Sequence, residues 1–152
     1  MYEIYCDGSC KNNGGVNPKA AYAFILFEIT PDYQKELYRE SGKIENGTNN
    51  IAEMTAMLKA LEYWKENYGD SVLVHCDSAY VVNAYRQKWI DNWRRNGWMT
   101  KNRTPVKNKE LWIELDKFFQ DRQNVRLDKV EGHSNVYWNN VVDGMAQGEW
   151  DK

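Results

Sequence analysis

The sequence predicts a single α/β domain built on a five-stranded mixed sheet, with three antiparallel strands and two parallel ones flanked by helices. Two observations lead to this class. Three strand-like segments open the chain, and two short apolar strands then alternate with helical stretches. The chain has 152 residues and 42% hydrophobic content, which suits one compact core and leaves no room for a second domain.

The first third of the chain predicts an antiparallel meander. Residues 2–7 alternate like a strand and run into Asp7-Gly8-Ser9, which is a turn signal. Residues 20–29 form a largely apolar run that is typical of a buried strand, and residues 36–44 alternate weakly. Three consecutive strands joined by turns favour antiparallel pairing.

The rest of the chain predicts helices around two further strands. Apolar residues recur at three- and four-residue spacing from Ile51 to Tyr68, and Gly69 closes this helical pattern. A strand at residues 72–76 follows, so that strand, long helix and strand form a parallel crossover unit. The remaining elements are a helical stretch at residues 79–88, the basic Trp-rich segment, a helix at 109–121, a strand at 125–130 and a last helix from Val136; with the Trp-rich segment counted as helical, the order is βββαβαααβα.

Charge is distributed unevenly along the chain. The net charge is −2, but residues 86–109 carry eight Lys or Arg and one acid, so this segment is +7 and the remainder is −9. Trp89, Trp93 and Trp98 fall in the same segment. Basic groups interleaved with aromatic rings suit a nucleic-acid backbone. Trp112 follows just after the segment, and the alternative is that Trp89, Trp93 and Trp112 anchor short helices to the core while the charges face solvent.

Cysteine usage and hydropathy indicate a cytoplasmic protein. Cys6, Cys10 and Cys76 are an odd number without metal-ligand spacing, which favours reduced thiols. The first residues alternate like a strand, so we expect no signal or transit peptide. No apolar run is long enough to span a bilayer, and we expect no membrane association.

Four acidic residues, Asp7, Glu53, Asp77 and Asp143, are candidates for a shared site. Three of them also have an ordinary structural explanation. Asp7 suits an Asp-Gly turn, Glu53 follows Asn50 at capping-box spacing, and Asp77 could cap the next helix. Asp143 lies on or beside the apolar side of the last helix, where an aspartate is both a poor helix former and costly to bury.

The combination of these carboxylates predicts a metal-dependent hydrolase. Asp7 and Asp77 are expected to end neighbouring strands, at the sheet edge where ligands bind in α/β proteins. Converging carboxylates repel one another, and hard cations such as Mg²⁺ relieve that repulsion. Two such ions could activate water for phosphodiester hydrolysis, and His133, on a Gly-flanked loop, could move protons nearby.

Several motifs occur in a fixed order along the whole chain. They are Asp7-Gly8-Ser9-Cys10, Thr48-Asn49-Asn50-x-Ala52-Glu53, Asp77-Ser78-x-Tyr80-Val81, Trp89-x3-Trp93-x4-Trp98-x-Thr100, Pro105-Val106-x-Asn108, Gly132-His133 and Asp143. In this order the chain resembles a bacterial-type type 1 ribonuclease H from the first strand to the last helix.

This resemblance implies an endonuclease that cleaves the RNA strand of an RNA/DNA hybrid, leaving 5′-phosphate and 3′-hydroxyl ends, with Mg²⁺ or Mn²⁺ as cofactor. It implies that Asp7, Glu53, Asp77 and Asp143 bind two metal ions, and that His133 is a catalytic histidine on a loop. Residues 86–109 look like the family's basic protrusion, which grips the DNA strand. The implied substrate-binding residues are Cys10 on the RNA strand, Asn49 and Asn50 in the minor groove, Thr48 and Asn108 around a DNA phosphate, and Trp89, Trp93, Lys101, Arg103 and Lys107 in the protrusion.

The chain departs from the family pattern at Ala20-Ala21-Tyr22-Ala23, at Ala79 and at Gly144, and none of these positions is an expected metal ligand. Two other functions are compatible with parts of this pattern. A catalytically idle hybrid-binding module is disfavoured by the complete carboxylate set, and a transposase, resolvase or exonuclease by the Trp-rich protrusion. We expect a monomer, and recruitment by a partner such as a single-strand-binding protein is left open.

Overall fold

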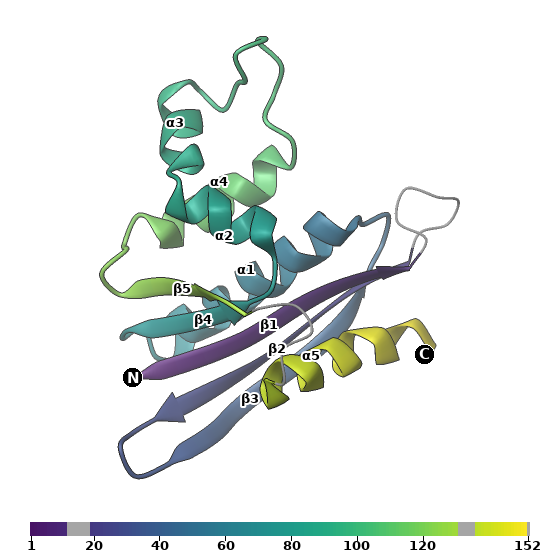
Figure 1. Ribbon diagram of the computed structural model, residues 1–152, viewed down its shortest axis with the longest axis vertical. Coiled ribbons are helices and arrows are strands. Elements are labelled where there is room, and N and C mark those ends of the chain that lie inside the picture. Colours follow the sequence, from purple (N-terminus) through teal and green to yellow (C-terminus); the bar gives the residue numbers. More distant parts are fainter. Residues whose placement is uncertain (12–18, 131–135, 152) are drawn as a thin grey trace.

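The structure is a computed structural model that describes residues 1–11, 19–130 and 136–151. Its elements follow the predicted order βββαβαααβα, with a short 3-10 helix added at the end (Figure 1). They are β1 (Tyr2–Lys11), β2 (Lys19–Ile29), β3 (Gln34–Ile44), α1 (Asn49–Asn67), β4 (Val72–Cys76), α2 (Ala79–Arg86), α3 (Trp89–Arg95), α4 (Lys109–Phe119), β5 (Val125–Lys129), α5 (Tyr137–Gly148) and η1 (Glu149–Asp151).

The five strands form one mixed sheet in the order β3-β2-β1-β4-β5. The β1–β2 and β2–β3 pairs are antiparallel, whereas β1–β4 and β4–β5 are parallel. The predicted five-stranded mixed sheet is therefore confirmed. β1 lies at its centre, where the antiparallel half meets the parallel half.

Helices cover both faces of the sheet (Figure 1). The core on one face joins the sheet to α1, α2, α3 and α4, and a second core joins β1 and β2 to α5. On β2, Phe24 and Leu26 belong to the first core, and Ile25 and Phe27 to the second. Burial on both faces explains why the sequence of β2 is continuously apolar instead of alternating.

The departures at Ala21, Ala23 and Gly144 are compatible with the fold. Ala21 and Ala23 are fully buried in the core beneath α5, where they pack with Val142 and Ala146. Gly144 faces open space, and α5 runs unbroken from Tyr137 to Gly148. Glycine lowers helix propensity at this position without ending the helix.

The predicted turn at Asp7-Gly8-Ser9 is wrong. These residues lie inside β1, where they pair with Ala23, Tyr22 and Ala21 of β2, and the strand continues to Lys11. A long neighbouring strand supplies the hydrogen bonds that an Asp-Gly turn would have supplied locally. Tertiary pairing therefore overrides the local turn preference.

The helix that follows β4 is shorter than predicted, because Lys88 takes the left-handed conformation with φ of 60°. The chain then leaves the body of the molecule as α3 and the extended segment that returns to α4 (Figure 1). Residues 86–109 are called the basic protrusion from here on. Within the part of the chain that the structure describes, no helix is long and apolar enough to cross a membrane.

Candidate active site

The central strand β1 has an open edge next to β4. Its pairing with β4 ends at Tyr5 and His75, whereas its pairing with β2 continues to Lys11. Asp7 lies just past the point where the β4 ladder stops, and it is only 3% exposed. A buried carboxylate on an open strand edge needs partners that compensate for lost hydration.

Gly8 brings α1 against this edge. A Cβ atom at Gly8 would overlap the carbonyl carbon of Ala52 and the backbone nitrogen of Glu53. The backbone N–H of Gly8 also donates a hydrogen bond to the Glu53 carboxylate. Only glycine permits this close approach, so Gly8 is a site residue that the sequence reading mistook for part of a turn.

Both helices near the site are capped by residues other than the acids. Thr48 caps α1, since its hydroxyl accepts a hydrogen bond from the Ile51 N–H at 3.2 Å. Ser78 caps α2 by accepting from the Val81 N–H at 3.2 Å. The capping box of Asn50 with Glu53 and the cap by Asp77 are therefore wrong. Their carboxylates are not used for capping and are available to the site.

Asp7, Glu53 and Asp77 converge. One carboxylate oxygen from each residue lies within 4.8 Å of the other two, and this is the only such acidic group in the described residues that could hold a metal ion. The predicted convergence is confirmed for these three. A set of carboxylate oxygens with no sulfur or nitrogen donor fits a hard divalent cation.

Asp143 approaches the same cluster from α5, on the other side of β1. When Asp7 is protonated, its carboxyl donates a hydrogen bond to the Asp143 carboxylate, which also accepts from the Gln147 side chain at 3.0 Å. It lies outside the compact group that the other three acids form. Its position is therefore beside the site, and its role as a metal ligand stays a prediction. His133 lies outside the described residues.

The cluster raises the proton affinity of its own members. Burial raises the pKa of Asp7 well above its ordinary value, and the neighbouring charges of Glu53 and Asp77 raise it further. Burial and the charge of Asp77 likewise raise the pKa of Glu53, although the Gly8 N–H stabilises its ionised form. A bound cation would favour the ionised carboxylates and lower these pKa values.

Two buried cysteines come directly before two of the acids in the chain and lie next to the carboxylate cluster. Cys6 precedes Asp7, Cys76 precedes Asp77, and both thiols are buried. Burial raises the pKa of both thiols, so they remain protonated and act as small apolar groups. All three cysteines are free, in agreement with the predicted reduced state.

We expect Asp7→Asn to stabilise the metal-free protein by about 2 kcal/mol near neutral pH. The folded-state pKa of Asp7 is raised, so the folded protein retains a proton that the unfolded chain loses above its ordinary pKa of about 4. Wild-type stability therefore falls as pH rises through this window, whereas Asn carries no such penalty. Urea unfolding in chelator at several pH values measures the difference. The exposed Asp32→Asn is the control, and a less stable Asp7→Asn protein at neutral pH would contradict the prediction.

Polar groups predicted to bind substrate gather beside the acids. The Cys10 thiol contacts the carbonyl oxygen of Gly47 at 3.5 Å, which places the end of β1 next to the start of α1. Thr48, Asn49 and Asn50 follow directly at this helix terminus, and Asn49 is exposed. These residues therefore form a polar margin along the same sheet edge as Asp7 and Glu53.

Asn108 stands at the start of α4 in the left-handed conformation, with φ of 61°. Its side-chain Nδ2 is buried and has no hydrogen-bond partner among the described residues. A buried amide donor without an acceptor is uncommon in proteins and indicates a missing partner. A phosphate oxygen is an acceptor of the required kind.

The tryptophans run from the core to the surface. Trp112 is fully buried, its ring lies 5.5 Å from that of Trp93, and Trp93 lies 6.4 Å from Trp89. The core alternative is therefore right for Trp112. Trp89 and Trp93 are partly exposed and line a pocket of about 400 Å³ together with Asn92, Asn96, Thr100 and Lys101. The sequence reading missed the two asparagines, although their position beside the aromatic residues was a usable signal.

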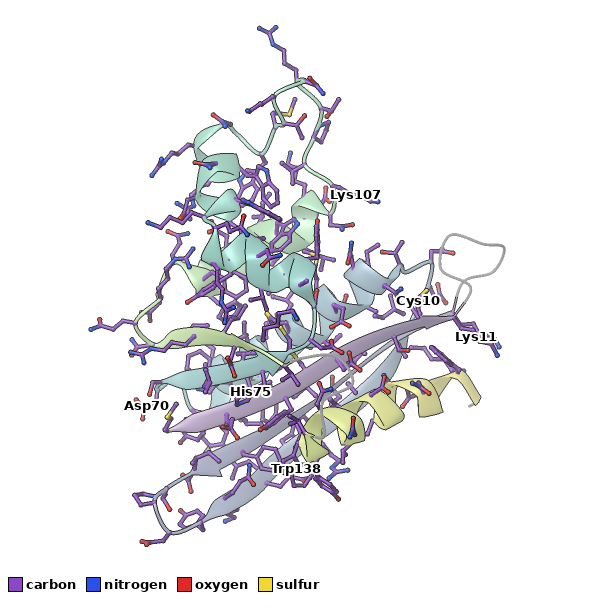
Figure 2. All side chains as sticks on the ribbon, viewed as in Figure 1. Cys10, Lys11, Asp70, His75, Lys107 and Trp138 are labelled. Carbon is purple, nitrogen blue, oxygen red and sulfur yellow. The ribbon has the colours of Figure 1, made fainter. Side chains whose placement is uncertain are left out.

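The cations of the basic protrusion fall into two groups. Lys101, Arg103 and Lys107 are exposed, and Figure 2 shows Lys107 where the chain enters α4. Arg94 instead forms ion pairs with Asp91 and Asp116. The positive charge that solvent sees is therefore smaller than the sequence count of +7.

The fold and the carboxylate cluster together define an α/β enzyme with a site suited to a divalent metal ion. The RNase H family model matches residues 1–150. The chain is also 41% identical over 149 residues to a ribonuclease H of Clostridium botulinum, which covers 98% of this chain and 95% of the relative. The chain belongs to the ribonuclease H family, whose members are nucleases and hence hydrolases.

Solved structures agree on the fold. LC9-RNase H1, a type 1 RNase H with the type 2 active-site motif, superimposes with a TM-score of 0.81 at 20% identity, covering 97% of this chain and 70% of that chain. The foamy viral protease-reverse transcriptase in complex with an RNA/DNA hybrid gives a TM-score of 0.82 at 18% identity, covering 97% of this chain and 20% of that much longer chain.

Proposed function

We propose that this protein hydrolyses the RNA strand of RNA/DNA hybrids, leaving 5′-phosphate and 3′-hydroxyl ends. The observation that carries the proposal is the convergence of Asp7, Glu53 and Asp77 at the open edge of β1, in a chain of the ribonuclease H family. The foamy viral relative in fold was solved with such a hybrid bound.

The carboxylates would hold two Mg²⁺ ions, with Mn²⁺ as a substitute, and Asp143 and His133 would complete the catalytic set. Bound ions of this kind supply an activated water and stabilise the leaving oxygen of a phosphodiester. The chain supplies the fixed geometry. Asp7 is buried, Glu53 is half-buried, and the Gly8 N–H orients the Glu53 carboxylate, so little reorganisation is needed when the site is loaded.

Selectivity for the RNA strand would come from the polar margin at the start of α1. A protein distinguishes RNA from DNA by contacting the 2′-hydroxyl, and RNA/DNA hybrids have a shallow minor groove that short polar side chains reach. Asn49 and Asn50 would make these contacts, with Glu53 as a further acceptor for the hydroxyl proton. Cys10 would contribute through its backbone.

The DNA strand would be held by Thr48, Asn108 and the basic protrusion. The Thr48 hydroxyl uses an acceptor position for capping and keeps its proton for a phosphate oxygen, and Asn108 offers its unpartnered amide. Trp89 and Trp93 would receive a deoxyribose or base in their pocket, while the surrounding cations hold the backbone. The enzyme would act as a cytoplasmic monomer, and a single-strand-binding protein is a candidate recruiting partner.

A strand-specific cleavage assay tests the function. One hybrid is labelled in its RNA strand and a second in its DNA strand, and each is incubated with Mg²⁺, with Mn²⁺ or with chelator, beside duplex DNA and duplex RNA. We expect internal cuts in the RNA strand of the hybrid only, with 5′-phosphate ends and no reaction in chelator. Cutting of both strands would contradict the selectivity. Tight binding without cleavage under any metal would support the idle hybrid-binding module instead.

The triple variant Lys101→Ala, Arg103→Ala and Lys107→Ala should weaken hybrid binding and flatten its salt dependence by about 2 to 3 in the slope of log K against log salt. These exposed cations would release counterions from the DNA backbone, and turnover at saturating substrate should change little. Filter binding across a salt series measures the slope. A triple Ala variant at the exposed Lys35, Lys59 and Lys65 removes the same charge elsewhere and is the matched control. Equal slopes for both triple variants would mean that the protrusion is solvated surface.

A further inference from the structure

Arg94 on α3 is bound to a nearly buried carboxylate on α4. Its Nε donates to one oxygen of Asp116 at 2.8 Å and its Nη2 to the other at 2.7 Å, so the pair is bidentate. The side chain of Asp116 is only 7% exposed, and Gln120 also donates to it at 3.2 Å. A planar guanidinium held at both oxygens of a carboxylate fixes direction as well as distance.

The contact continues into the body of the protein. Asp91 on α3 accepts from Arg94 at 2.8 Å and lies 3.6 Å from Arg122, which precedes β5. Arg122 stacks over the ring of Tyr85 on α2 at 4.2 Å and donates to the Tyr85 carbonyl oxygen at 2.8 Å. The Tyr85 hydroxyl in turn donates to the carbonyl oxygen of Val125 on β5 at 3.0 Å. A continuous polar network therefore ties α3 to α4, α2 and the sheet.

The backbone of the basic protrusion needs such an anchor. Five non-glycine residues in the described chain have positive φ, and four of them, Lys88, Trp98, Arg103 and Asn108, lie in this segment. Residues held in the left-handed region persist only where the surrounding structure constrains them. The neighbouring Arg95 is exposed and has no ion pair in the described part of the chain, so it differs from Arg94 in contacts and not in charge.

We infer that Arg94 and Asp116 are positioning residues, which hold the basic protrusion and its tryptophan pocket in the orientation that receives the DNA strand, and that Arg94 is not a phosphate contact. This inference rests on the proposed function and deepens it. It separates Arg94, an internal anchor, from Lys101, Arg103 and Lys107, which are the cations proposed to contact the DNA strand. Trp89 and Trp93 lie on the same helix as Arg94, so loss of the anchor misplaces the pocket they line.

The variant Asp116→Asn separates positioning from simple attraction. It removes a negative charge next to the protrusion, so long-range electrostatics alone predicts tighter binding of a polyanion. If the ion pair instead anchors the protrusion, its loss should weaken binding of the hybrid. We expect Asp116→Asn to raise KM for the hybrid about 3- to 10-fold, with kcat within about 2-fold of wild type. A KM equal to or below that of wild type would overturn the inference.

The second variant, Arg94→Lys, keeps the charge and loses the planar fork, with Arg95→Lys as the matched control on the same helix. We expect Arg94→Lys to raise KM as Asp116→Asn does, and Arg95→Lys to leave it unchanged. Equal effects of the two lysine variants would overturn the inference, and this comparison holds even if Asp116→Asn fails to fold.

Hydrogen exchange of residues 89–100 is measured in parallel, without substrate. Faster exchange in Arg94→Lys but not in Arg95→Lys supports the anchor, and unchanged exchange refutes it, whether or not the wild-type protein cleaves hybrids.

Discussion

Replacing Asp77 by Asn should lower the rate of RNA-strand cleavage by more than about 10²-fold, because even groups that only orient a metal ligand contribute 10- to 100-fold. Asp77 lies immediately after β4 and shares the compact group with Asp7 and Glu53. It is not needed as a helix cap, since Ser78 fills that role. The substitution therefore removes a charged oxygen from the site and leaves both flanking elements intact.

Single-turnover cleavage at saturating Mg²⁺ is the measurement, with hybrid binding recorded in parallel. We expect binding to persist, because the basic protrusion and the polar margin are untouched. Asp70→Asn is the control, since Asp70 is an exposed aspartate that lies away from the labelled Cys10 end of β1 in Figure 2. Undiminished cleavage by the Asp77→Asn protein would mean that the carboxylate cluster is not the active site.

Replacing Gly8 by Ala should destabilise the protein by about 3 kcal/mol or more and abolish cleavage at the same time. The new Cβ would overlap backbone atoms of Ala52 and Glu53, and backbone cannot rotate away as a flexible side chain can. Either α1 moves off β1 or β1 bends. Both responses carry the Glu53 carboxylate away from Asp7 and Asp77, so stability and activity are lost through one contact.

Gly144→Ala is the matched control for this substitution. A Cβ at Gly144 meets nothing within 4 Å, and the residue itself is exposed within α5. Alanine should stabilise the helix there by about 0.5 to 1 kcal/mol, because it has the higher helix propensity. Chemical unfolding of the two variants distinguishes the steric cost of a Cβ at Gly8 from the effect of helix propensity at Gly144. A Gly8→Ala protein as stable as wild type would show that α1 does not need the close approach.

The sequence predicted the order of all ten principal elements and the mixed sheet, because each long element carries its own periodic pattern. The helix that contains Met54, Leu61 and Trp64 was predicted correctly from its apolar spacing, and these residues are buried as that spacing requires. Predictions failed where a local signal had two meanings. Asp7-Gly8 reads as a turn in isolation, yet pairing with β2 keeps it extended.

The burial of the individual tryptophans is a second feature that the sequence could not predict. Trp89, Trp93 and Trp112 have the same chemistry and lie within or just after the basic segment, so composition could not separate core from surface. The structure places Trp112 wholly inside and leaves Trp89 and Trp93 at a pocket. Likewise, Arg94 counted as one more cation until its bidentate contact with Asp116 was visible. Long-range partners, not residue type, decide these roles.

By itself the sequence determined the fold class, the family resemblance and the identity of the acids, because these depend on residue types and spacings that lie along the chain. The tertiary structure decided which acids form the compact group, that Gly8 is the residue that lets α1 approach β1, and that Arg94 is an internal anchor. These features depend on distances between segments far apart in sequence. Such distances are fixed only when the sheet orders its strands and the helices pack upon it.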